Sequence, residues 1–190
     1  MTQGDTDAQL TKSKEQIIRK AEELAIEYEA VYKGCAQSTF MAITGALRWG
    51  GVDIVPEEIE DRLYPGLCQL AAGIAITGEG SGAVTASALA IGMALAVMHG
   101  IIGKDASTVG DACEIVRREI LDKFYDTYNS QRCVDIQLKR FGKAWDFRKP
   151  EMSDEFLSIT DGCAVKEGSG WAVAAIVDEL EQYTQKLSLG

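Results

Sequence analysis

Three cysteines and one serine stand where the sequence predicts that helices begin. Cys35, Cys133 and Cys163 each follow a polar or glycine-containing turn, and Ser81 follows the glycine-rich stretch 77–80. The first turn of a helix has unpaired N–H groups and a partial positive charge, which stabilise a thiolate and lower its pKa from ~8.5. We therefore expect the three thiols and the hydroxyl to converge on one site, where the cysteines act in redox chemistry or bind a metal.

The turn before Ser81 also offers a second chemistry. Glu79 is the only charged residue between Arg62 and Lys104. Glu79 could act as an acid or base in catalysis. Ser81 and the N–H groups at Gly82 would then bind an anionic or carbonyl oxygen, and a cysteine would be the nucleophile. A simpler interpretation is that Glu79 interacts with the helix dipole on a solvated turn. The sequence leaves both open.

The other two cysteines lie inside predicted helices. Cys68 and Cys113 are expected to be small buried apolar residues, apart from the other three. Five cysteines, no CxxC pair and one histidine, His99, argue against a disulfide framework and a zinc site. The chain has no CxxCH motif, which excludes covalently attached haem.

Hydrophobic periodicity predicts the elements that would position these residues. Apolar residues at three- and four-residue steps predict a first helix from Ile17 to Tyr32, with a capping box at Ser13 and Gln16 and an end at Gly34. Further helices are predicted at about 35–49, 57–64, 66–76, 81–99, 107–128, 133–141 and 163–187.

The remaining segment, 142–162, is predicted to be a long ordered connection without regular structure. Four of its side chains are expected to hold it against the helices: Trp145, Phe147, Phe156 and Leu157.

A run of small apolar residues from Ala83 to Met98 predicts the centre of the fold. It is about 16 residues long, shorter than the ~20 that cross a bilayer, and it is rich in alanine. A helix that is apolar all round must be covered all round. We expect an all-α domain over 1–190, a bundle of about seven or eight helices around a central helix near 81–99, with no membrane span.

Composition narrows the partners. The net charge of −10 offers no basic stripe for a nucleic-acid backbone, so nucleic acid is not an expected partner. The polar N-terminal segment lacks the features of a secretory signal, which favours the cytoplasm. The expected partners are a small molecule or a redox partner protein, and a homo-oligomer is an open alternative.

Four stretches of the chain carry a family resemblance: "GCAQSTFMAI", "GIAITGEGSGAVTASALAIGMAL", "RCVDI" and "GCAVKEGSGWAVAAIVDEL". Together they resemble the redox-active family named C-GCAxxG-C-C, which has four characteristic cysteines and a Cys-Gly-Ala-x-x-Gly motif at the start of a central helix. The resemblance covers roughly 34–180. It implies that Cys35, Cys133 and Cys163 are three of the four cysteines, and that the fourth position is Ser81.

The serine changes what the resemblance implies. A hydroxyl forms no disulfide and is a poor substitute for a thiolate. Either the chain is a paralogue with different chemistry, or Ser81 is an introduced replacement. The sequence thus predicts a redox-active or iron–sulfur protein, an oxidoreductase if it is an enzyme, with Cys35, Cys133 and Cys163 as metal ligands. The alternatives are the metal-free site at Glu79, Ser81 and Gly82, or a scaffold that binds partners through its first helix.

Overall fold

The predicted all-α class is confirmed. The computed structural model describes residues 10–98 and 109–188, and within them the β pairing consists of one isolated bridge between Gly80 and Arg132. The elements are α1 (Lys14–Tyr32), α2 (Cys35–Trp49), α3 (Glu57–Cys68), α4 (Gly82–Met98), α5 (Val109–Val116), the π-helix η1 (Arg117–Leu121), α6 (Asp122–Tyr128), α7 (Cys133–Phe141), α8 (Pro150–Ile159) and α9 (Cys163–Ser188). With α5, η1 and α6 taken as one continuous helix, the described part of the chain contains eight helices.

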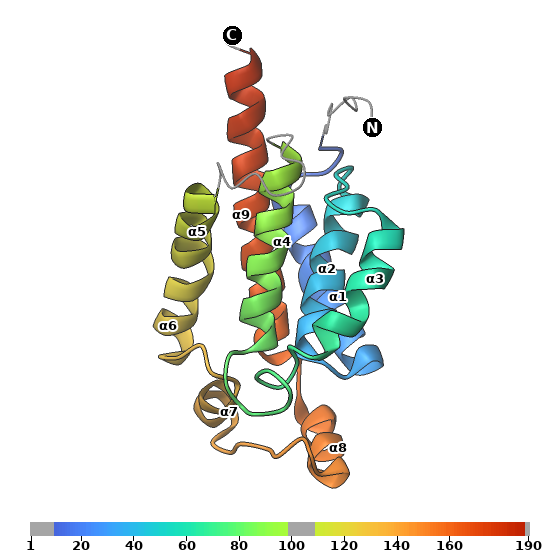
Figure 1. Cartoon of the computed structure of the whole chain (residues 1–190), viewed down its shortest axis with the longest axis vertical. Helices are drawn as coiled ribbons and strands as arrows, with labels where there is room; N and C mark the ends of the chain where they lie inside the picture. The colour runs from blue at the N-terminus through green and yellow to red at the C-terminus, as the bar shows by residue number, and fades with distance from the viewer. Residues whose placement is uncertain (1–9, 99–108, 189–190) are drawn as a thin grey trace.

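Four helices form the core of the bundle. α1, α2, α4 and α9 pack against one another, α3 covers α2, and α5 and η1 cover α4 and α9 (Figure 1). α2, α4 and α9 all begin at the lower end of the view and run upward, while α1 runs the other way. The short helices α7 and α8 lie at that lower end. The first turns of three parallel helices therefore lie together at one end of the molecule.

α4 is buried because its residues are small. Ala83, Ala86, Ala90 and Ala94 have no exposed surface, which lets the neighbouring helices approach closely. The Ser87 hydroxyl donates across to the Gly168 carbonyl of α9 at 3.1 Å. No helix among the described residues is long and apolar enough to span a membrane.

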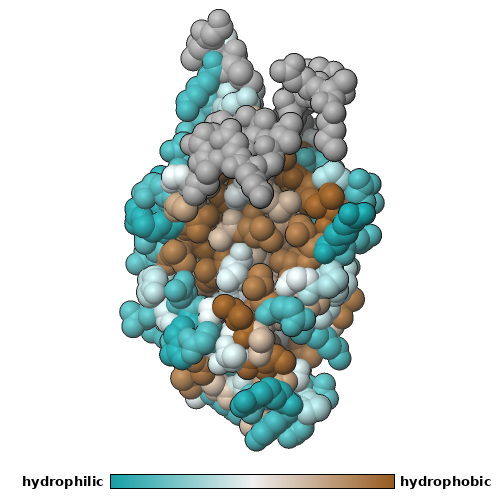
Figure 2. Space-filling view, viewed as in Figure 1, coloured by the Kyte–Doolittle hydropathy of each residue, from teal (hydrophilic) through white to brown (hydrophobic). Residues whose placement is uncertain are grey.

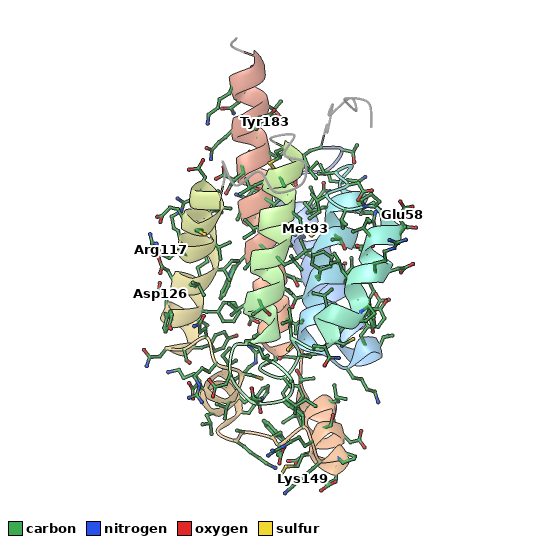
Figure 3. The ribbon with its side chains drawn as sticks, in the orientation of Figure 1. Glu58, Met93, Arg117, Asp126, Lys149 and Tyr183 are labelled. Atoms are coloured by element: carbon green, nitrogen blue, oxygen red, sulfur yellow. The ribbon has the colours of Figure 1, made fainter. Side chains whose placement is uncertain are left out.

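One face of α4 remains partly open. Figure 2 shows an apolar strip running along the middle of the molecule between polar flanks, and Met93 lies on α4 in the same orientation (Figure 3). The labelled charged residues Glu58, Arg117, Asp126 and Lys149 lie at the periphery (Figure 3). The open face of α4 thus lies between charged residues of the neighbouring elements.

The capping box predicted for the first helix is present. The Ser13 hydroxyl accepts from Gln16 N, and the Gln16 side chain accepts from Ser13 N. Lys33, in the left-handed region with φ 55°, ends α1 just before Cys35.

The helix predicted at 66–76 is wrong. α3 ends at Cys68, and the five residues 72–76 all have positive φ. A Cβ on residue 73 would lie 2.3 Å from Glu79 N, so only glycine fits where the loop folds back on itself. The left-handed conformation costs roughly 1–2 kcal/mol for each L-residue, and Ile74 and Ile76 are β-branched. Tertiary contacts must hold this strained loop in place.

The irregular connection predicted at 142–162 is wrong in part, because it contains α8. Pro150 occupies the first turn of α8, where its fixed φ favours a helix. The expected attachment is present: the rings of Trp145 and Phe156, 5.4 Å apart, are both buried. His99, the end of the helix predicted at 81–99, the start of the one predicted at 107–128 and the N-terminal segment 1–9 lie outside the described residues.

Candidate functional site

A cavity of about 250 Å³ lies at the end of the bundle where helices begin. Cys35, Cys133, Cys163 and Ser81 all line it, so the structure brings together the four positions that the sequence placed at helix starts. Its walls are largely apolar, and the exposed side chain of Lys33 lies at its rim.

A short antiparallel pairing brings the starts of α4 and α7 side by side. Ser81 N donates to Gln131 O at 2.9 Å, and Cys133 N donates to Glu79 O at 2.7 Å. The Ser81 carbonyl in turn accepts from Thr85 N in the first turn of α4. These main-chain bonds place the Ser81 hydroxyl and the Cys133 thiol on the same cavity.

The Cys133 thiol is held by a buried amide. Gln137, one helical turn later, donates from Nε2 to Cys133 Sγ at 3.1 Å. Its Oε1 accepts from Trp145 N at 2.8 Å, which fixes the orientation of the amide. Gln137 is thus a positioning residue for this sulfur.

Cys163 begins α9 from an unusual backbone conformation. Gly162 has φ 97° and Cys163 has φ 38°. A Cβ on Gly162 would lie 2.8 Å from Ile26 Cγ1, so the start of α9 approaches α1 closely. The buried Cys163 thiol therefore depends on both a glycine and a strained turn.

A buried carboxyl shares the cavity with these thiols. Glu29 lies in the last turns of α1, 5% exposed, and Thr160 donates to its Oε2 at 3.0 Å. Burial raises the pKa of Glu29 to about 7, and the Thr160 hydrogen bond offsets only part of this shift. A large share of Glu29 side chains is therefore protonated at neutral pH.

The expected lowering of the thiol pKa values is wrong. Burial raises the pKa of Cys133 to about 12, and it also raises the pKa values of Cys35 and Cys163. The nearby Glu29 carboxylate disfavours all three thiolates as well. Loss of hydration outweighs the helix N-termini here, so the resting state of the site consists of neutral thiols.

Glu79 does not line the cavity. Its two carboxylate oxygens accept from Nε and Nη2 of Arg132, each at 3.0 Å, on the exposed side of the paired segments. Of the two interpretations that the sequence left open for Glu79, the structure favours the one on a solvated turn over the acid–base role. Gly82 is also absent from the cavity lining, and it instead packs directly against Cys35.

The expectation for the two remaining cysteines is wrong in different ways. Cys68, the last residue of α3, lines the same cavity as the other three instead of lying apart. Cys113 is exposed on α5, whereas the sequence predicted a buried apolar residue.

The fit of the site to a metal is poor. Across residues 10–98 and 109–188, no group of three or more His, Cys, Asp or Glu side chains is placed to hold a metal ion. The structure therefore gives no support to the expected iron–sulfur cluster, and no chemical step is derived through one.

Comparison of the chain with family models, curated proteins and solved structures gave no match.

Sequence reasoning missed three members of the site, although two left a signal. Glu29 lies four residues after Ala25, on the buried face of α1, and Gln137 lies four residues after Cys133. A polar residue on an apolar helical face is a candidate for a buried role. Cys68 left no such signal, because the loop that follows it was predicted to be a helix.

Proposed function

We propose that the protein is a redox-active thiol protein whose cavity cysteines cycle between thiols and a disulfide. The observation that carries this proposal is the convergence of Cys35, Cys133 and Cys163 on one cavity, although they are far apart in sequence. An ionised Cys35 would raise the pKa of Cys133, and an ionised Cys133 would raise that of Cys163, which supports the closeness of the three sulfurs. The resemblance to the C-GCAxxG-C-C family supports the same class of chemistry.

The chemistry needs no metal. Two thiols lose two protons and two electrons as their sulfurs join, and a disulfide in a small molecule or partner protein accepts both as it becomes two thiols. Because the thiols are neutral at rest, the step begins with loss of a thiol proton. An ionised Glu29 carboxylate can accept that proton, which leaves the net charge in the cavity unchanged.

The apolar walls favour a small or extended reactant over a folded surface. Phe147 and Leu157 from the α8 side and Ile136 from α7 line the cavity beside the thiols. Such walls exclude water from the sulfurs, which protects a buried thiol from unspecific oxidation.

Reversible thiol counting tests this proposal. The variant Cys113→Ser removes the exposed cysteine and with it disulfides between chains. Oxidation of this variant by a glutathione redox buffer should remove two free thiols per chain, and dithiothreitol should restore them. A thiol count that stays constant across the whole range of buffer potentials would reject the proposal.

A further inference from the structure

Cys68 is a fourth thiol on the cavity, and it lies on the more open side. Cys35 and Cys68 are both partly exposed, whereas Cys133 and Cys163 are buried. All four line the same cavity. Although Cys35 is partly exposed as a residue, its thiol is buried against Ala72 and Gly82, so a reactant that enters from solvent meets Cys68 first.

Contacts on both sides of Cys68 bring it to the start of α2. Four residues before it, the Tyr64 ring packs edge-on against Tyr32, with centroids 5.5 Å apart, at the end of α1. Four residues after it, Ala72 N donates to Cys35 Sγ at 3.4 Å. These contacts hold the end of α3 and the loop after it at the start of α2, where Cys68 lines the same cavity as Cys35.

The loop that follows Cys68 can supply the movement that a disulfide requires. Its residues 72–76 have positive φ, including the β-branched Ile74 and Ile76. Both isoleucine side chains are exposed, so main-chain hydrogen bonds and the close contact at Gly73 hold the loop, with little help from their packing. Relaxation of this strained loop would shift the end of α3 and the thiol that it carries.

We propose that Cys68 is the exchange thiol, which reacts first with a small-molecule disulfide and then forms a disulfide with Cys35. This inference rests on the proposed redox function. Burial and the nearby Glu29 carboxylate raise the pKa of the Cys35 thiol. This thiol therefore stays protonated while Cys68 reacts, and it acts only in the second step. With Cys68 included, the site still has four thiols, although Ser81 stands at the fourth of the positions predicted to hold cysteine.

The exchange balances in two steps. Cys68 loses its proton and attacks one sulfur of the substrate, which breaks the substrate S–S bond and releases one thiol that takes up a proton. Cys35 then loses its proton and attacks the Cys68 sulfur of the mixed disulfide. The second substrate thiol leaves with a proton, and the protein keeps a disulfide between Cys35 and Cys68. Two electrons pass to the substrate, and no other oxidant is needed.

Disulfide mapping with oxidised glutathione as the probe tests the inference. The Cys113→Ser protein is oxidised, alkylated in acid and analysed by peptide mass spectrometry. We expect a peptide that links Cys35 to Cys68. The further change Cys35→Ser should trap glutathione on Cys68, while the control Cys133→Ser should still form the link.

The outcomes separate this inference from the proposed function. A link between Cys133 and either Cys35 or Cys163, with Cys68 free, would overturn the exchange role while the redox function stands. Absence of any disulfide within the chain would reject both. If Cys35→Ser fails to fold, the map of the Cys113→Ser protein alone still decides the pairing.

Discussion

Gly82 and Cys35 approach so closely that a Cβ on residue 82 would lie 2.5 Å from Cys35 Sγ. The same Cβ would lie 2.7 Å from Ala36 N, so the first turns of α4 and α2 are in direct contact. A real Cβ cannot occupy that space unless one helix moves. The absence of a side chain at residue 82 is therefore what allows Ser81 and Cys35 to face one cavity.

The variant Gly82→Ala should lose stability and disturb the site. We expect overpacking to cost about 1–3 kcal/mol in the free energy of unfolding, measured by urea titration. Gly92→Ala on the same helix is the matched control, because nothing lies within 4 Å of a Cβ there. That control should instead gain about 0.5–1 kcal/mol. Equal shifts in the two variants would contradict the close contact.

Alkylation should follow burial rather than helix position. In the native protein at neutral pH, iodoacetamide should label the exposed Cys113 first and the buried Cys133 and Cys163 last. The reason is that thiolates are the reactive form, and burial disfavours them. Time-resolved peptide mass spectrometry gives the order, and urea-unfolded protein, in which all sites should react alike, is the control. Labelling of Cys133 as fast as that of Cys113 would show that its thiolate is accessible.

Glu29 should make the protein less stable as the pH rises. Its pKa is about 7 in the fold against 4.5 as an ordinary side chain, so between these values the folded state binds more protons than the unfolded state. The contribution of Glu29 to the free energy of unfolding is therefore largest below pH 4.5, and it falls as the pH rises to about 7. The expected loss is about 3 kcal/mol, since one pKa unit corresponds to about 1.4 kcal/mol.

The variant Glu29→Gln isolates this effect. The amide oxygen can still accept from Thr160, but it carries no charge, so the fall in stability between pH 5 and pH 8 should shrink. Urea unfolding of both proteins at each pH gives the comparison. An unchanged pH profile in the variant would show that Glu29 is not the group whose titration lowers the stability.

Local patterns were enough to predict most of the fold. Periodicity and the capping box located α1, and the glycine-bounded helices α2 and α9 begin at the expected cysteines. The helix predicted at 66–76 is wrong because a short apolar run predicts a helix but carries no information on the handedness of the backbone. Its left-handed loop is held by the close approach of Gly73 to Gly78 and by a hydrogen bond to the distant Cys35, neither of which periodicity reports.

The residues that line the site were predicted better than their pKa values. Helix starts correctly pointed to Cys35, Cys133, Cys163 and Ser81 as neighbours of one cavity. The depth of that cavity, which raises the thiol pKa values, is a property of the whole bundle. The sequence left the role of Glu79 open for a similar reason, because its partner Arg132 lies 53 residues away in the chain.

The variant Ser81→Cys separates a thiol site from a metal site. Ser81 is 3% exposed and lines the cavity beside Cys35 and Cys133, so a cysteine there would add a thiol among the others. We expect little iron or sulfide in either the natural chain or the variant after anaerobic reconstitution. We also expect the variant to form an additional or alternative disulfide on oxidation, seen by peptide mapping.

The reason lies in the charge that each chemistry places in the cavity. A disulfide is neutral, whereas a cluster would bring several thiolate ligands into a cavity with largely apolar walls, and no group of side chains placed to hold a metal is found among the described residues. Iron and sulfide bound firmly by the variant alone would show that Ser81 stands in place of a missing soft ligand. Firm binding by the natural chain would make the hydroxyl itself a ligand. Either result would replace the thiol-exchange mechanism with a metal centre built on the same helix starts.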